Sequence, residues 1–188
     1  MEIFFLQHKL TLCDHSEDTD SPTLAFEQLE AGNNVNLRCS LRELVKTIKE
    51  RYIFVKAAGG IVKNQQGQML IIHREGRWDL PKGMVEQHET LAQAALREVA
   101  EETGQQHCSI ESTCNKSLPL AKTYHIYDKY GGWHLKQTTW FPMIATQLSD
   151  IRPQREEGID SCQWMEPEIW KQKMETSFPS LQNLIKQL

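Results

Sequence analysis

The stretch REVAEETG, residues 97–104, places three glutamates, Glu98, Glu101 and Glu102, directly after Arg97. On an α-helix, their spacing of i, i+3 and i+4 puts the three carboxylates within an arc of roughly 100°. Like charges at that spacing repel one another, and acidic side chains near a helix C-terminus are unfavourable. Arg97 can offset one of the charges. The remaining repulsion between the carboxylates would be relieved by a positively charged partner, which a solvated helix face does not supply.

The residues around this stretch predict a helix with defined ends. Residues 90–93, Thr-Leu-Ala-Gln, form a capping box at its start, and Gly104 is suited to its C-cap. Apolar residues occupy both of its sides, so the carboxylates should converge on a partly sheltered spot. Clustered carboxylate oxygens suit hard cations such as Mg²⁺ or Mn²⁺. The alternative is a solvated run of glutamates.

The rest of the chain predicts one mixed α/β domain of ordinary size, flanked by two smaller segments. We expect an N-terminal extension at 1–50, a main domain at 51–175 and a helical tail at 176–188. Residues 77–89, RWDLPKGMVEQHE, are rich in turn residues and are expected to be irregular. The expected helices and strands are a strand or hairpin at 2–13, helices at 23–31 and 40–49, a hairpin at 53–74, the helix at 90–104, strands at 118–128, 133–146 and 160–165, and a tail from 167 with a break near 179.

Composition excludes several functional classes. The chain has 188 residues and a net charge of −4, so it offers no global basic field to nucleic acid. No apolar run approaches a membrane span, and the N-terminus lacks the pattern of a signal peptide. The five cysteines are scattered without a C-x-x-C pair, which favours reduced thiols. These features predict a cytoplasmic protein that contacts neither nucleic acid nor membrane.

A longer pattern containing the glutamates resembles the Nudix box. It runs from Gly83 through Glu89 to the stretch 97–104, with intervals of five and seven residues. The preceding WDLPKG, residues 78–83, resembles the W-x-L-P-K-G of Nudix branches that act on polyphosphates. One position departs from the pattern, because Gln105 stands where the box usually has an aliphatic residue. That change affects packing after the helix rather than chemistry.

The resemblance covers about residues 53–170. It implies an α/β (α+β) fold, specifically a Nudix-like α/β/α sandwich with a mixed sheet, here with a small N-terminal α/β extension. It also implies a hydrolase that uses Mg²⁺ or Mn²⁺ to split a pyrophosphate bond in a nucleoside diphosphate linked to another moiety.

The resemblance further implies roles for the residues that match the box. By position these are Glu98, Glu101 and Glu102 as metal ligands or catalytic base, Gly83 as a metal ligand through its carbonyl, Arg97 as the residue that orients the glutamates, and Glu89 as support for Arg97 or the metal shell. Which glutamate is the base stays open.

Further candidates lie outside the box. Glu156 and Glu157 fall in a predicted loop, where Glu157 is the preferred catalytic base and the alternative is an exposed acidic loop. Three cations are candidates for binding phosphate: Lys82, Arg74 and Lys136. The aromatic residues Trp78, Tyr124 and Tyr127 could stack on a base, although strand aromatics more often belong to a core.

The substrate is expected to be a small phosphorylated molecule, most simply a nucleotide. Dinucleoside polyphosphates are favoured, damaged nucleoside triphosphates come second and inositol pyrophosphates third. The contrasting hypothesis is a domain that senses a nucleotide metabolite without turnover. A homodimer is also compatible with the sequence.

Overall fold

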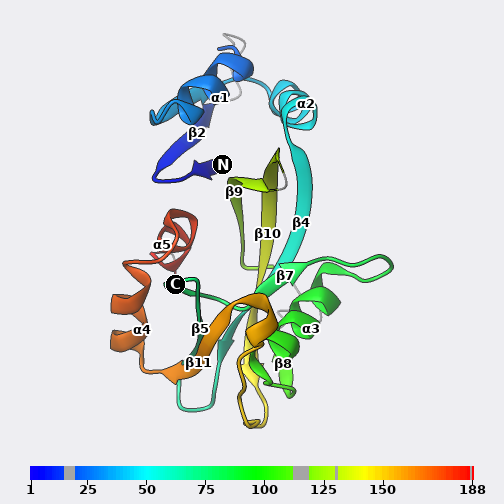
Figure 1. Ribbon diagram of the computed structural model, residues 1–188, viewed down its shortest axis with the longest axis vertical. Coiled ribbons are helices and arrows are strands. Elements are labelled where there is room, and N and C mark those ends of the chain that lie inside the picture. The colour runs from blue at the N-terminus through cyan, green and yellow to red at the C-terminus, as the bar shows by residue number, and fades with distance from the viewer. Residues whose placement is uncertain (15–19, 112–118, 130, 187) are drawn as a thin grey trace. The chain divides into compact units, whose positions relative to one another are not determined.

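The computed structural model describes residues 1–14, 20–111, 119–129, 131–186 and 188, which form two compact units (Figure 1). The first unit comprises Met1–Val55 and Thr123–Gln137, and the second comprises Lys56–Lys122 and Thr138–Leu188. The first unit therefore includes residues from the middle of the chain as well as the N-terminal extension.

The first unit combines a small sheet with two helices. Its strand β1 pairs antiparallel with β2 and parallel with β9, and β2 pairs parallel with β3. Ser40 caps the second helix by accepting a hydrogen bond from the Glu43 backbone N–H, as the sequence predicts. The elements are β1 (Glu2–Phe5), β2 (His8–Asp14), α1 (Pro22–Glu30), β3 (Val35–Arg38), α2 (Leu41–Arg51), and parts of β4 (Ile53–Lys63), β9 (Ala121–Lys129) and β10 (Gly132–Ala145).

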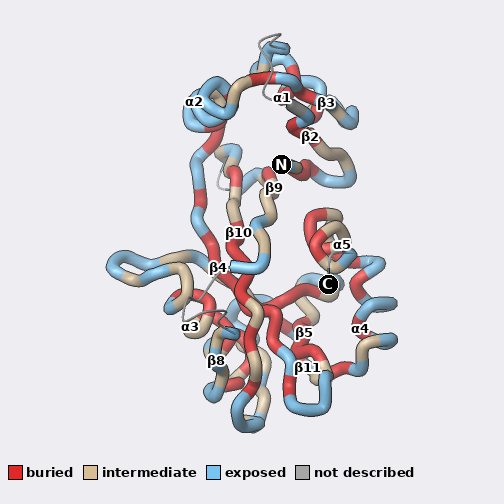
Figure 2. The backbone as a smooth tube through the Cα atoms, turned by 180° about the vertical axis from the view of Figure 1, so that it is seen from behind, coloured by how far each residue is buried: buried red, intermediate tan, exposed pale blue. Residues whose placement is uncertain are grey.

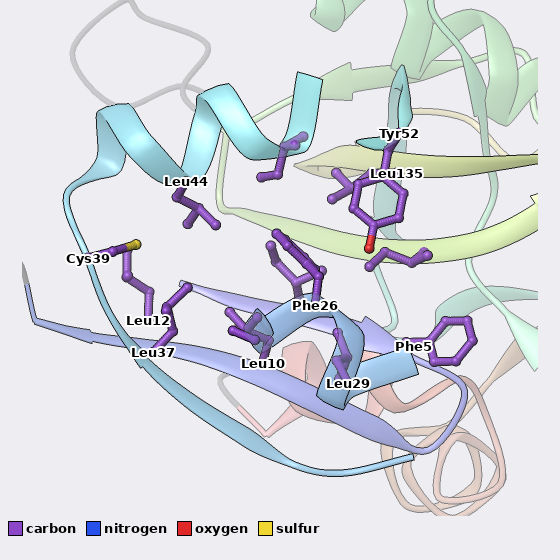
Figure 3. Packing of buried hydrophobic residues seen from close by; sticks show 14 residues of the cluster. Phe5, Leu10, Leu12, Phe26, Leu29, Leu37, Cys39, Leu44, Tyr52 and Leu135 are labelled. Atoms are coloured by element: carbon purple, nitrogen blue, oxygen red, sulfur yellow. The ribbon is translucent and has the colours of Figure 1, made fainter. Parts of the chain in front are cut away.

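Both helices of the first unit pack on one apolar core (Figure 3). Phe26 of α1 and Leu44 of α2 are fully buried, and the ring of Phe26 meets that of Tyr52 edge to face at 5.2 Å. Glu30 ties the ends of the two helices together, because it accepts hydrogen bonds from Arg51 and from the Tyr52 hydroxyl. The core thus includes residues that are far apart in the sequence.

The second unit is built on strands in the order β11-β5-β4-β10. Three short strands attach to this sheet, β6 to β5, β7 to β4 and β8 to β10. Its remaining elements are β5 (Met69–Arg74), β6 (Arg77–Asp79), β7 (Lys82–Met84), α3 (Leu91–Thr103), β8 (Cys108–Ile110), η1 (Arg155–Glu157), β11 (Ile159–Met165), α4 (Pro167–Met174) and α5 (Pro179–Ile185).

Helices cover both faces of this sheet. On β5, Leu70 belongs to the core under α3, whereas Met69 and Ile71 belong to the core under α4 and α5. Because successive strand residues point to opposite faces, α3 lies on one side and the tail helices lie on the other. Figure 2 shows that most of β5 is buried. Among the described residues, no helix has the length and apolar character needed to cross a bilayer.

The mixed α/β class is confirmed, but the sequence reading missed several short strands. Residues 77–89 are not wholly irregular, because they contain β6 and β7. Strands β3 and β8 were also not expected. Each has three or four residues, too few for a periodic pattern, and each forms because a longer strand supplies its hydrogen bonds. The first residue of the strand expected at 118–128 lies outside the described residues, and so does residue 130, between that strand and the one expected at 133–146.

Candidate active site

Helix α3 carries the three glutamates, and its ends are those that the sequence predicts. Thr90 and Gln93 form the reciprocal capping box, and Gly104 ends the helix with φ of 75°. The three carboxylates differ in environment: Glu98 and Glu102 are buried, whereas the Glu101 side chain is 49% exposed. The helix therefore presents one accessible carboxylate and two sheltered ones.

Gly83 lies directly against the carboxylate of Glu98. Strand β7 pairs with β4 through Ala58 and Gly83, which fixes the Gly83 backbone next to α3. A Cβ atom built on Gly83 would overlap the carboxyl group of Glu98. Glycine is required here by the close approach of the carboxylate, since its φ does not lie in the left-handed region.

Arg97 binds three carboxylates and one backbone carbonyl. Its Nε and Nη2 donate to the two oxygens of Glu89 at 3.1 and 2.7 Å. Its Nη1 donates to Glu98 and Glu101, both at 2.8 Å, and Nη2 also donates to the Met84 carbonyl at 2.9 Å. Arg97 thus offsets more than the single charge expected from the sequence, and it ties α3 to the segment that precedes it.

The surroundings of Glu98 oppose its ionisation. Burial raises the pKa of Glu98, and the charges of Glu101 and Glu157 raise it further, although Arg97 acts in the opposite direction. By contrast, the hydrogen bonds from Arg97 lower the pKa of Glu89. The pair Glu89–Arg97 is therefore a stable ionic support, while burial and two neighbouring carboxylates oppose the negative charge of Glu98.

Glu102 faces a different group of partners. It accepts a hydrogen bond from the Lys82 backbone N–H at 2.7 Å and one from Arg74 at 3.3 Å. Burial raises the pKa of Glu102 to about 7, although the positive charges of Lys82 and Arg74 act against that increase. The Lys82 ammonium donates to Asp79 at 2.6 Å. Burial alone would lower the pKa of Lys82, but Asp79 and Glu102 raise it.

The burial of Glu102 predicts that the stability of the metal-free protein depends on pH. The pKa of Glu102 rises from 4.5 to about 7 on folding, so the folded state holds its proton more tightly than the unfolded chain. The free energy of unfolding should therefore fall as pH rises from about 4.5 to 7, by about 3 kcal/mol from this group. Chemical denaturation across this range, with a chelator present, should show that loss in the native protein and its absence in Glu102→Gln. Parallel pH profiles for the two proteins would contradict the assignment.

Arg74 connects Glu102 to the acidic segment before β11. Its other guanidinium nitrogen lies 3.7 Å from a carboxylate oxygen of Glu157, whose side chain is 46% exposed. Glu157 belongs to the 3-10 turn η1, as does Glu156, which is also exposed. The structure therefore brings Arg74 and Glu157 together with the box glutamates, with Glu157 near enough to act on the pKa of Glu98.

The two lysines predicted to bind phosphate have other partners in the structure. Lys82 is held by Asp79, and only 11% of its side chain is exposed. Lys136 belongs to the first unit, where its ammonium lies 5.3 Å from the centre of the Tyr127 ring. A phosphate-binding role for either lysine stays a prediction. Among the aromatic candidates, Trp78 packs edge to face on His73 at 4.8 Å, and Tyr124 accepts a hydrogen bond from Gln137.

The donors around Glu98 have the chemistry that a hard divalent cation requires. Glu98, Glu101 and Glu157 supply carboxylate oxygens, and the backbone of Gly83 lies against Glu98 with no side chain between them. Within the described ranges, no three acidic, histidine or cysteine side chains are gathered into a closed set of ligands. This arrangement fits Mg²⁺, which is commonly held by one or two carboxylates together with water and substrate phosphates.

Sequence reasoning missed two members of this site. Asp79 is buried and binds Lys82, and the Met84 carbonyl accepts from Arg97. The acid three residues before Lys82 was a visible signal for the first. No sequence signal identifies a particular carbonyl as a partner of Arg97, because the contact depends on how β7 passes α3.

Comparison with known proteins supports the resemblance to the Nudix family. The sequence model of the NUDIX domain matches residues 54–184. A Bacillus subtilis (strain 168) protein named "Putative 8-oxo-dGTP diphosphatase" is 41% identical over 54 residues. That match spans 28% of this chain and only 36% of the relative's length.

Two solved structures have a similar fold. The C. elegans Ap4A hydrolase in a binary complex has a TM-score of 0.52 and 21% identity, over 70% of this chain and 93% of that one. The NUDIX domain of Shewanella oneidensis NrtR, complexed with ADP ribose, has a TM-score of 0.54 and 21% identity, over 79% of this chain and 96% of that one. At this identity both bear on the fold alone. The NUDIX match covers more than half of this chain, and the box residues are assembled around Arg97. This chain therefore belongs to the Nudix hydrolase family.

Proposed function

We propose that this chain is a pyrophosphohydrolase that uses Mg²⁺ or Mn²⁺ to cleave a phosphoanhydride bond of a nucleotide. One observation carries the proposal. The carboxylate of Glu98 is held against Gly83 by Arg97, while burial, together with the charges of Glu101 and Glu157, raises its pKa. Such an arrangement costs stability, and its cost is explained if a cation binds there during turnover.

Glu98, Glu101, Glu102 and the backbone of Gly83 would hold the ion. A bound divalent cation would neutralise charge on the phosphate oxygens and acidify a water molecule. Glu102 already accepts hydrogen bonds from the Lys82 backbone N–H and from Arg74, so fewer of its lone pairs are open to an ion. Glu98 and Glu101 are therefore the preferred ligands of this set.

The remaining residues would position water and phosphate. Glu157 is half-exposed and can accept a proton from the attacking water, which forms a bond to phosphorus as the bridging oxygen departs. Arg74, beside Glu157 and partly exposed, can donate to a phosphate oxygen. Arg97 and Glu89 hold Glu98 in place throughout, because their ion pair is bidentate.

Two substrate classes remain in competition. The WDLPKG segment and the acidic residues of η1 favour dinucleoside polyphosphates, the class expected from the sequence. The B. subtilis relative favours a nucleoside triphosphate such as 8-oxo-dGTP, although its match covers only 54 residues. Both classes present a charged polyphosphate chain attached to an aromatic base.

The metal requirement predicts a sharp result. Phosphate-coupled turnover should be measured with Mg²⁺ and Mn²⁺ on dinucleoside polyphosphates, nucleoside triphosphates including 8-oxo-dGTP, nucleotide sugars and inositol pyrophosphates. We expect turnover of one class to fall at least about a hundred-fold on chelation and to return when metal is added. Undiminished turnover in chelator would contradict the metal requirement.

A sensor would behave differently in the same experiment. It would bind one of these compounds tightly in the presence of metal without hydrolysing it, and that outcome would overturn the proposed activity. The homodimer stays a prediction, and a purely monomeric sedimentation profile at high concentration would exclude it.

A further inference from the structure

The segment Trp78–Gly83 is held between two groups of residues on opposite sides. Trp78 and Leu80 pack with the core under α4 and α5, which includes Trp170, Met174 and other residues of the tail. On the other side, Glu102 of α3 accepts from the Lys82 backbone N–H, while Asp79 and the Lys82 ammonium form an ion pair within the segment itself. Each side thus restrains the same short stretch of backbone.

The tail contacts this segment through specific polar groups as well as apolar packing. The Ser177 hydroxyl, 2% exposed, donates to the Trp78 carbonyl at 2.6 Å. The Lys173 ammonium lies 5.5 Å from the centre of the Trp78 ring, and the Arg77 guanidinium lies 5.2 Å from that of Phe178. A partly buried hydrogen bond and two cation–π contacts restrain the position of β6.

The position of β6 determines the position of the active-site backbone. Only Leu80 and Pro81 separate β6 from β7, and Pro81 accepts a hydrogen bond from the Gly60 N–H at 3.1 Å. A shift of the backbone at Trp78 would therefore also shift the backbone of Lys82 and Gly83, because the connection between them is so short. Gly83 has no space to move toward α3, because the Glu98 carboxylate lies against it.

From these contacts we infer that the tail, residues 167–185, is a positioning element for the active site and that Ser177 is its positioning residue. The inference rests on the proposed function and adds to it a role for a segment outside the box. Ser177 acts through the Trp78 carbonyl on the backbone of Lys82 and Gly83. It does not itself contact substrate.

Two variants and two matched controls test this role. Ser177→Ala removes the hydrogen bond to Trp78, whereas Thr176→Ala removes the exposed hydroxyl that donates to the Lys173 carbonyl next to it. Lys173→Ala removes the cation over Trp78, whereas Lys171→Ala removes a similar cation that lies 5.6 Å from the centre of the Trp170 ring. Lys173 is exposed, so this variant should fold even if Ser177→Ala does not.

The readouts are kinetics and site-resolved amide hydrogen exchange. Ser177→Ala should lower kcat roughly five-fold with little change in KM, and Lys173→Ala roughly two-fold. The amides of Gly60 and Lys82 should exchange faster by similar factors, while exchange elsewhere in the second unit stays unchanged. Both controls should match the native protein.

Other results would overturn the inference. A uniform rise in exchange with unchanged kcat per folded molecule would assign Ser177 and Lys173 a role in stability alone. Decreases in kcat of the same size in Thr176→Ala and Lys171→Ala would likewise contradict a specific positioning role for Ser177 and Lys173. The exchange measurement needs no substrate, so it still decides the positioning role if the native protein hydrolyses nothing in the panel and the proposed function fails.

Discussion

Replacing Glu98 with glutamine should lower kcat at least about a thousand-fold without lowering the melting temperature. Glutamine keeps the shape of the side chain but loses the charge that would bind metal. Burial and the charges of Glu101 and Glu157 raise the pKa of Glu98, so its ionised form costs the folded state free energy at neutral pH. Removing that charge should leave stability unchanged or increase it, since Arg97 keeps its bonds to Glu89 and Glu101.

The measurement is steady-state turnover at saturating metal, together with a thermal melt of each protein. Glu168→Gln is a suitable control because Glu168 is an exposed glutamate on α4 in the same unit. Retention of more than about a tenth of native turnover in Glu98→Gln would remove this carboxylate from the chemistry. A large drop in melting temperature would instead assign Glu98 a structural role.

Replacing Gly83 with alanine should have the second largest effect, because the new Cβ and the Glu98 carboxylate would overlap. Either the carboxylate moves or β7 shifts from its pairing with Ala58 on β4. We expect turnover to fall at least about a hundred-fold, since small displacements of a reacting group are costly. Stability should fall by about 1–3 kcal/mol, the usual range for an overpacked site.

A double-mutant cycle isolates the contact between Gly83 and Glu98. In a Glu98→Ala background the added methyl group has room, so Gly83→Ala should cost at least about 1 kcal/mol less stability there than in the native protein. Gly132→Ala is the matched control, because a Cβ at Gly132 would lie at an ordinary distance of 3.5 Å from Ile53. Additive free energies in the cycle, or full activity in Gly83→Ala, would show that the two residues do not compete for space.

The parts of the site that the sequence predicted well depend on local geometry. The helix at 91–103 has its capping box, its C-terminal glycine and its glutamate spacing within one short stretch. The spacing also placed Glu98, Glu101 and Glu102 on neighbouring positions of that helix. The spacing did not predict that the three glutamates lie in different environments. Glu98 faces Gly83, Glu102 faces Lys82 and Arg74, and Glu101 remains exposed.

The parts that the sequence missed depend on partners distant in the chain. Strands β6 and β7 have three residues each, and their pairing partners lie in β5 and β4. The first unit takes residues 123–137 into the same compact body as residues 1–55. No local pattern signals such an association, because it follows from which apolar faces can be buried together.

By itself, the sequence determined the family and the helix that carries the glutamates, and it predicted that those glutamates bind a hard divalent cation. These follow from residue types at fixed short spacings, which an α-helix converts directly into geometry. Only the tertiary structure decided that Arg97 binds Glu89 and the Met84 carbonyl, that Asp79 holds Lys82, and that the tail reaches Trp78 through Ser177. Those contacts join separate elements, so they exist only after the sheet and its covering helices have packed.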